Sequence, residues 1–143
     1  MIGSCLCDSV EFSIEIEKLK IYQCHCSLCR KQTGTASSCG AIVKGEKFSW
    51  LTGSENISTW KMEEGFTSHF CSTCGSSVPN HFMGNDLYWI PAGLIQSEKI
   101  ETIANIYVGD KLNWSNVDSH INQYLERPEL EKLIELFTEE DNA

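Results

Sequence analysis

The stretch "CHCSLC", residues 24–29, places three cysteines within six residues. Cysteines this close in the chain rarely form good structural disulfides with one another, but their thiolates can share one metal ion. Zinc takes four ligands in a tetrahedron, so the triplet Cys24, Cys26 and Cys29 leaves one position for another ligand. A zinc site with an open position is typical of catalysis or ligand binding.

Two cysteine pairs flank the triplet, Cys5 with Cys7 and Cys71 with Cys74. Together they supply four thiolates, enough for a closed tetrahedral zinc site that joins the start of the chain to its middle. A closed site is structural, because its metal-binding free energy adds to the free energy of folding. In "CSTCG" the glycine at position 75 can take the backbone conformation that closes a metal-binding turn. The sequence therefore predicts two zinc sites, one closed and one open.

Two alternatives stay open for the triplet. Cys26 and Cys29 could form a thioredoxin-like redox pair, but the third thiol of Cys24 and the β-rich sequence oppose this. A protein side chain could also close the site and make both zinc ions structural. The candidates for this fourth ligand are Cys39, His25, His69 and His81. We expect the His25 ring to point away from the metal, and Cys39 to be a small buried apolar residue.

Short β-strands are the main structural signal outside the cysteines. Apolar residues alternate with polar ones over residues 10–16, which is typical of a strand with one buried face. Further runs rich in aromatic and β-branched residues are separated by Gly, Asn, Ser or Asp. These runs cover residues 41–43, 47–51, 57–62, 66–70, 87–95 and 103–108. The fold class predicted is a mainly β domain of short antiparallel strands.

Two segments are predicted to be helical. "SLCRKQTG", residues 27–34, allows one or two turns that end at Gly34. "RPELEKLIELFTEE", residues 127–140, indicates an amphipathic helix with Pro128 in its first turn. Its apolar stripe consists of Leu130, Leu133, Ile134 and Phe137. We expect this stripe to pack on the domain's own core, with a dimer contact as the alternative. The predicted division is a β domain at 1–126, with the C-terminal helix and tail at 127–143 packed on it.

Length and charge restrict the classes of function. The 143 residues suit one domain, and no run is long and apolar enough to span a bilayer. A net charge of −9 with scattered Lys and Arg argues against nucleic-acid binding and against adsorption to anionic membranes. The first ten residues lack the features of a signal peptide, so we expect a cytoplasmic protein. In a reducing cytosol, eight cysteines favour metal binding over disulfides.

The cysteine motifs resemble those of the glutathione-dependent formaldehyde-activating enzymes, a family that includes centromere-protein-V-like members. The matching stretches are "GSCLCDSVEF", "CHCSLCRKQTG", "FCSTCG" and, more weakly, "IYVGDKLNW", in the family's order from residue 3 to about residue 114. The resemblance implies a zinc-bearing fold called a β-tent, with a structural zinc at the two pairs. It implies a second zinc at the triplet, where a substrate thiol or water completes the shell.

The resemblance also implies a function: a carbon–sulfur lyase acting on a thiol–aldehyde adduct such as S-hydroxymethylglutathione, or the reverse reaction. A small thiol and an aldehyde are then the partners, and Arg30 and Lys31 are candidates for contacts with the glutathione carboxylates. The alternative is a non-catalytic zinc module that holds glutathione or a protein partner. Two departures concern the substrate pocket: Asp8 replaces the family's usual glycine, and "SSVPNHF" after the second pair is less apolar than usual.

Overall fold

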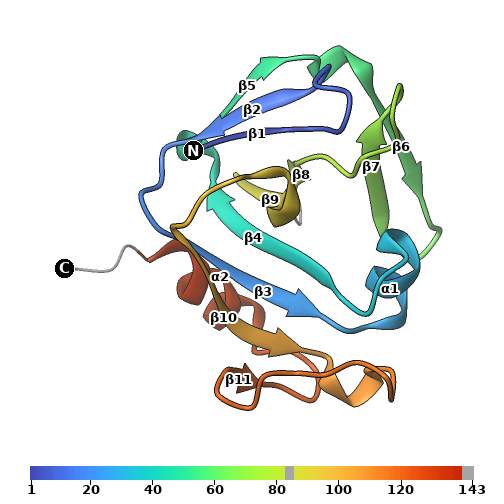
Figure 1. Ribbon diagram of the computed structural model, residues 1–143, viewed down its shortest axis with the longest axis vertical. Helices are drawn as coiled ribbons and strands as arrows, with labels where there is room; N and C mark the ends of the chain where they lie inside the picture. Colours follow the sequence, from blue (N-terminus) through green and yellow to red (C-terminus); the bar gives the residue numbers. More distant parts are fainter. Residues whose placement is uncertain (83–85, 140–143) are drawn as a thin grey trace. The chain divides into compact units, whose positions relative to one another are not determined.

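The computed structural model describes residues 1–82 and 86–139 of the chain. It is mainly β, with short strands and two α-helices in the described residues (Figure 1). The chain divides into two compact units. Unit 1 comprises Met1–Glu17 and Val43–Glu98, and unit 2 comprises Lys18–Ile42 and Lys99–Ala143. Each unit is therefore assembled from two separate segments of the sequence.

Unit 1 contains antiparallel strands around an apolar interior. One sheet has the order β1-β2-β5, and two further pairs are β6 with β7 and β8 with β9. The bounds are β1 Ile2–Ser4, β2 Glu11–Ile14, β5 Phe48–Thr52, β6 Ile57–Lys61, β7 Thr67–Cys71, β8 Asn80–His81 and β9 Leu87–Pro91. A buried cluster joins Val10 and Val78 to the cysteines at positions 5 and 71. The two cysteine pairs are thus anchored in the core of this unit.

Unit 2 is built on β3 (Leu19–Cys24), which lies between β10 (Ile100–Ile106) and β4 (Ser38–Lys44) in the order β11-β10-β3-β4. The strand β11 covers Asn122–Gln123, and the helices are α1 (Ser27–Thr33) and α2 (Leu130–Thr138). On α2, Leu133 and Phe137 are buried, and the Phe137 ring meets the Tyr22 ring edge-on at 5.2 Å. The chain passes from β3 directly into α1, so the triplet lies where strand and helix join.

The structure confirms the mainly β fold and the C-terminal amphipathic helix, and it corrects two details. Strands β3 and β10, and β10 and β11, pair in parallel rather than antiparallel. Between β3 and β10 the chain passes through the second segment of unit 1, and such a long connection allows it to return in the same direction. Helix α2 begins at Leu130, with Glu129 as N-cap, so Pro128 precedes the first turn. Arg127 Nη1 donates a hydrogen bond to the Pro128 carbonyl, and the first intrahelical bond runs from Leu133 N–H to the Glu129 carbonyl.

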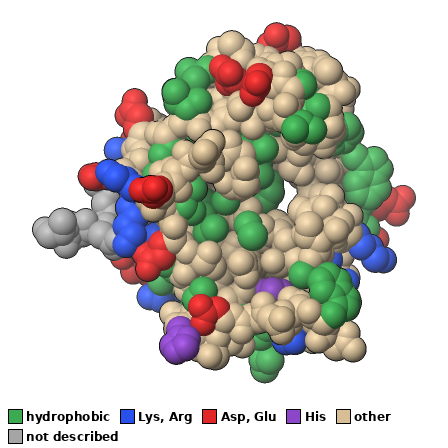
Figure 2. Space-filling model, in the orientation of Figure 1, with side chains coloured by type: hydrophobic (Ala, Val, Ile, Leu, Met, Phe, Trp, Pro, Cys, Tyr) green, Lys and Arg blue, Asp and Glu red, His purple; other side chains and the backbone are tan. Residues whose placement is uncertain are grey.

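The surface combines both signs of charge. On the face shown in Figure 2, Lys and Arg side chains lie among Asp and Glu side chains. One exposed ion pair joins Lys18 Nζ to Glu101 Oε2 at 2.7 Å. In the described part of the chain, neither helix has the length and apolar character that crossing a membrane requires.

Candidate metal centres and a ligand pocket

The four sulfurs of Cys5, Cys7, Cys71 and Cys74, here called the quartet, lie within 4.8 Å of one another in unit 1. The Cys5 and Cys7 sulfurs are 3.6 Å apart, and those of Cys7 and Cys71 are 3.8 Å apart. A tetrahedron with zinc–sulfur bonds of about 2.3 Å has sulfur–sulfur edges of about 3.8 Å. A disulfide needs about 2.05 Å. The observed separations therefore fit a zinc ion, and all eight cysteines are free thiols.

Similar turns hold the two halves of the quartet. The Asp8 N–H donates to the Cys5 carbonyl at 3.0 Å, and the Gly75 N–H donates to the Cys71 carbonyl at 2.8 Å. Both closing residues have a positive φ, 61° at Asp8 and 80° at Gly75. The left-handed conformation predicted for Gly75 is confirmed. Asp8 adopts it without being glycine, which Asp tolerates better than most side chains.

Polar side chains around the quartet were not apparent from the sequence. The Ser9 hydroxyl lies 3.1 Å from the Cys7 sulfur and 3.3 Å from the Cys71 sulfur. Asn56 Nδ2 donates to Ser9 Oγ at 3.2 Å and to the Cys71 sulfur at 3.6 Å. Hydrogen bonding by Ser9 lowers the pKa of Cys71 to about 7, and the Ser76 hydroxyl lowers the pKa of Cys74 to about 5. These groups favour thiolates, the form that binds metal.

The triplet lies entirely in unit 2, where its three sulfurs are within 4.8 Å of one another. Cys24 ends β3 and is buried, Cys26 is the N-cap of α1, and Cys29 lies in the first turn. Cys26 and Cys29 are partly exposed, and the Cys29 N–H donates to the Cys26 sulfur at 3.4 Å. One side of the cluster is therefore closed by the protein and the other is accessible.

Hydrogen bonds among the three thiols place one negative charge on Cys26. The Cys24 thiol, followed by the Cys29 thiol, lowers the pKa of Cys26 to about 2. The same contact with Cys26 raises the pKa of Cys24 to about 11, and Cys24 and Cys26 raise the pKa of Cys29. At neutral pH two of the three ligands are therefore protonated, and a metal ion would have to displace those protons.

In the described residues, no fourth Cys, His, Asp or Glu joins the triplet. Cys39 lies on β4, partly exposed, opposite Gln23 of β3, and burial raises its pKa. His25 directs Nε2 to Asn105 Oδ1 at 2.9 Å instead of to the cluster. His69 and His81 both belong to the pocket described below. None of the four candidate fourth ligands therefore belongs to the cluster of three sulfurs.

His25 fastens the triplet segment to β10. Its side chain is buried, only 1% exposed, with Nε2 turned to Asn105. The backbone N–H of His25 donates to the Ile106 carbonyl at 3.0 Å, and the backbone carbonyl of His25 accepts from Arg30 Nε at 3.2 Å. His25 Nδ1 and Asn105 Nδ2 are buried and have no hydrogen-bond partner in the described residues. Lys31, next to Arg30, is exposed.

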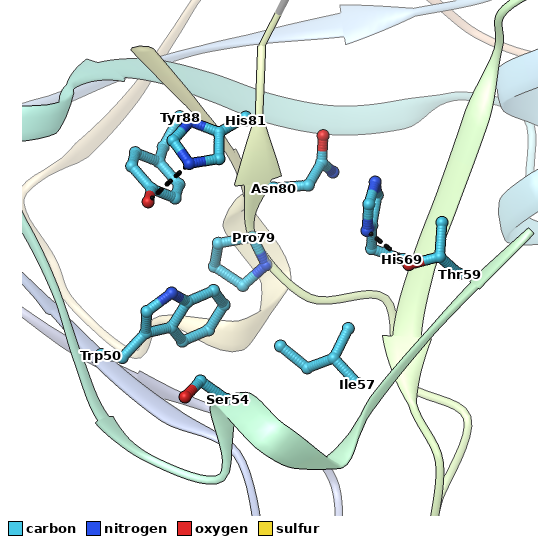
Figure 3. A pocket seen from close by; sticks show the side chains of 9 residues that line it. All are labelled: Trp50, Ser54, Ile57, Thr59, His69, Pro79, Asn80, His81 and Tyr88. Atoms are coloured by element: carbon cyan, nitrogen blue, oxygen red, sulfur yellow. Dashed lines mark hydrogen bonds between the residues drawn. The ribbon is translucent and has the colours of Figure 1, made fainter. Parts of the chain in front are cut away.

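A pocket of about 350 Å³ lies in unit 1 (Figure 3). It is lined by Trp50, Ser54, Ile57, Thr59, His69, Pro79, Asn80, His81 and Tyr88. His69 Nδ1 is 3.0 Å from Thr59 Oγ1, and His81 Nε2 is 3.1 Å from the Tyr88 hydroxyl. Burial, together with the charge of His81, lowers the pKa of His69. The sequence singled out both histidines by residue type but did not place them together.

Comparison with known proteins agrees with these observations. A protein named "Uncharacterized lyase" from Schizosaccharomyces pombe is 29% identical over 111 residues, which cover 76% of this chain and 79% of the relative. A crystal structure of a Rhodobacter sphaeroides protein shares the fold, with a TM-score of 0.56, 18% identity, and coverage of 87% of this chain and 99% of that chain. The sequence profile described as "Glutathione-dependent formaldehyde-activating enzyme" matches residues 1–110. The chain therefore belongs to the glutathione-dependent formaldehyde-activating enzyme family.

Proposed function

We propose that this chain is a zinc-dependent carbon–sulfur lyase that acts on a thiol–aldehyde adduct such as S-hydroxymethylglutathione. Membership of the family and the lyase name of the fission-yeast relative support a glutathione-related lyase role at the family level. The observation that carries the proposal is the triplet, three sulfurs within 4.8 Å with no fourth ligand in the described residues. The quartet would hold the second zinc ion in a structural role.

The donor atoms of the triplet suit a thiol substrate. Zinc bound by three cysteines would favour the thiolate form of a substrate thiol in the fourth position. Three thiolates leave such a site with a formal charge of −1, which weakens the metal as a Lewis acid. Thiol exchange therefore fits the site better than water activation. The partial exposure of Cys26 and Cys29 gives a thiol access, and the buried Cys24 fixes the cluster from the other side.

In the lyase direction the carbon–sulfur bond of the adduct breaks and its electron pair stays on sulfur. The hydroxyl group of the adduct loses its proton as the carbonyl forms, and the sulfur ends as the free thiol. No oxidant or reductant is required. Arg30 and Lys31 would provide positive charge near the triplet for the carboxylates of the thiol. Arg30 is held by its bond to the His25 carbonyl, whereas Lys31 is exposed.

The test compares the same Cys→Ser change at two different positions. Cys29→Ser removes a triplet ligand, and Cys39→Ser changes a thiol that belongs to neither cluster. NMR exchange of ¹³C-formaldehyde with glutathione measures the rate, and metal analysis counts zinc. We expect two zinc ions per chain in the wild type and in Cys39→Ser, and one in Cys29→Ser. The acceleration over the spontaneous reaction should disappear only in Cys29→Ser.

The same assay separates catalysis from simple binding. If the zinc-loaded wild type binds glutathione without accelerating the exchange, the chain is a non-catalytic module. If Cys29→Ser keeps the wild-type rate, or Cys39→Ser loses as much, the triplet is not the catalytic centre.

A further inference from the structure

The pocket in unit 1 contains none of the cysteines of the quartet or the triplet. Its volume of about 350 Å³ lies within the range of small-molecule sites, roughly 300–1,000 Å³. Ser54, Thr59 and His81 are exposed, and Pro79 is buried. The pocket therefore opens to solvent and has a buried apolar residue in its lining.

Aromatic rings in contact with one another line or support one side of the pocket, with Phe48 behind the lining residues. The Tyr88 ring stacks on the buried Phe48 ring at 4.0 Å, and the His81 and Tyr88 ring centres are 4.3 Å apart. The Trp50 ring meets Phe48 edge-on at 4.9 Å. Each ring is thus held by its neighbour, which lowers the entropy cost of ordering this side when a ligand binds. Figure 3 shows Trp50, Pro79 and Ile57 towards one end of the pocket.

The other end offers directional hydrogen bonds. His69 Nδ1 bonds with Thr59, and His81 Nε2 bonds with Tyr88. Within residues 1–82 and 86–139, this leaves His69 Nε2 and His81 Nδ1 for a ligand. In the view of Figure 3 the Asn80 amide is drawn between the two imidazole rings. An imidazole nitrogen can donate or accept according to its tautomer, and an amide offers both donors and an acceptor. A hydroxyl or carbonyl group can therefore be bound in either direction.

Charge restricts the ligand further. Among the described residues that line the pocket, none is Lys, Arg, Asp or Glu. An anion would meet no fixed positive charge here, in a chain with a net charge of −9. A cation would meet no carboxylate. Desolvating either ion without a partner is unfavourable, whereas a neutral polar group with hydrogen bonds is tolerated.

We propose that this pocket binds a neutral small molecule with a flat apolar part and one hydroxyl or carbonyl group. The flat part lies against Trp50, Pro79 and Ile57, and the polar group bonds to His69, Asn80 or His81. This assignment rests only on unit 1 and holds whether or not the triplet is catalytic.

The experiment uses three probes of the same shape, benzyl alcohol, benzoate and benzylamine, added to the zinc-loaded full chain at pH 8. At this pH an ordinary imidazole is neutral. NMR follows the indole N–H signals and the imidazole carbon signals. We expect benzyl alcohol to shift the Trp50, His69 and His81 signals to saturation, and both ions to bind at least about tenfold more weakly. No saturable shift, or equal binding of all three probes, would overturn the assignment.

Matched variants locate the site. Trp50→Leu removes part of the aromatic side, and Trp60→Leu changes a tryptophan that is 55% exposed and does not line the pocket. We expect Trp50→Leu to weaken benzyl alcohol binding by about fivefold and Trp60→Leu to leave it unchanged. If Trp50→Leu fails to fold, His81→Ala provides the same test from the exposed edge, with about the same loss. Equal weakening by Trp60→Leu, or no weakening by either Trp50→Leu or His81→Ala, would show that binding occurs elsewhere.

Discussion

In both the quartet and the triplet the sulfur atoms lie within 4.8 Å of one another, but they come from differently spaced parts of the chain. In the quartet, Cys7 and Cys71 are 64 residues apart, and the cluster is packed with Val10 and Val78. The triplet comes from six consecutive residues at the junction of β3 and α1. A metal that closes a long loop removes much conformational freedom from the unfolded chain, whereas one bound to a local segment removes little. The quartet is therefore suited to stabilising the fold, and the triplet can leave a position open for chemistry.

The largest expected difference between the clusters is in how much the loss of one cysteine ligand destabilises the folded protein. Cys71→Ser removes a fully buried ligand of the quartet, and we expect it to abolish cooperative unfolding or to give insoluble protein. The reason is that structural zinc contributes on the order of 10 kcal/mol to the folding of small zinc domains. Cys29→Ser in the triplet should change the free energy of unfolding by only about 1 kcal/mol. Circular dichroism during denaturant unfolding, with zinc analysis, measures both, and the reverse ranking would exchange the two roles.

Acid should remove zinc from the triplet before the quartet. The pKa of Cys24 is raised to about 11 and that of Cys29 is also raised, so zinc must displace a proton from each. In the quartet the pKa values of Cys71 and Cys74 are lowered to about 7 and 5, whereas that of Cys7 is raised, so protons compete at fewer ligands there. As pH falls from 8 towards 5.5, triplet affinity should fall by about 100-fold per pH unit, because two protons compete.

Dialysis at each pH, followed by metal analysis, tests this order. The wild type should lose one zinc at higher pH and the second at lower pH. Cys29→Ser should lack the first step. Loss of both ions in a single step would show that proton competition does not distinguish the clusters.

Each polar side chain that positions one of the clusters should affect the metal affinity of that cluster and not of the other. His25→Ala and Asn105→Ala each break the 2.9 Å bond that fastens the triplet segment to β10. We expect either to weaken metal binding at the triplet by about 10- to 100-fold, and the double variant to lose little more. Asn56→Ala should do the same to the quartet alone, because Asn56 bonds Ser9 and the Cys71 sulfur. Chelator competition measures both affinities, and an effect on the wrong cluster would refute this division.

The smallest expected effects come from the two turns of the quartet. Asp8→Gly relieves a φ of 61° and should stabilise the zinc-loaded protein by about 0.5 kcal/mol. Gly75→Ala places a side chain at a φ of 80° and should destabilise it by about 1 kcal/mol. Steric contact is not the reason, because among the described residues, its two chain neighbours aside, nothing lies within 4 Å of the new Cβ. Denaturant midpoints provide the comparison. Destabilisation by Asp8→Gly would mean that the Asp8 side chain, and not its backbone, matters.

Cysteine spacing was enough to recognise the two pairs and the triplet, because neighbours two or three residues apart must lie close in space. Joining the pairs into the quartet also needed the rule that a closed zinc site takes four ligands, since Cys7 and Cys71 are 64 residues apart. The turns at Gly34 and Gly75 could be predicted for the same local reason. Ser9, Asn56 and Asn105 could not, because they reach the clusters through tertiary contacts; Asn105 is 80 residues from His25. The supporting side chains depend on the fold, whereas the ligands depend on the local sequence.

Strand pairing and the pocket show the same limit. Strand β3 was missed because Lys20 and Gln23 interrupt its apolar residues, which does not match a simple alternation. Trp60 and Trp114 are more than half exposed, and Trp50 lines the pocket. Aromatic residues suit a strand, a core and a ligand site equally well, so their type alone could not separate these roles.

The most direct test of the open and closed sites is cobalt substitution followed by titration with glutathione. Binding of the thiol at the triplet should add a sulfur-to-cobalt charge-transfer band, with S-methylglutathione as the control that cannot form a thiolate. We predict a saturable new band with glutathione, none with S-methylglutathione, and none in Cys29→Ser. A spectrum that glutathione leaves unchanged in the fully loaded wild type would contradict the account, because it would mean that the triplet offers no position to a substrate thiol.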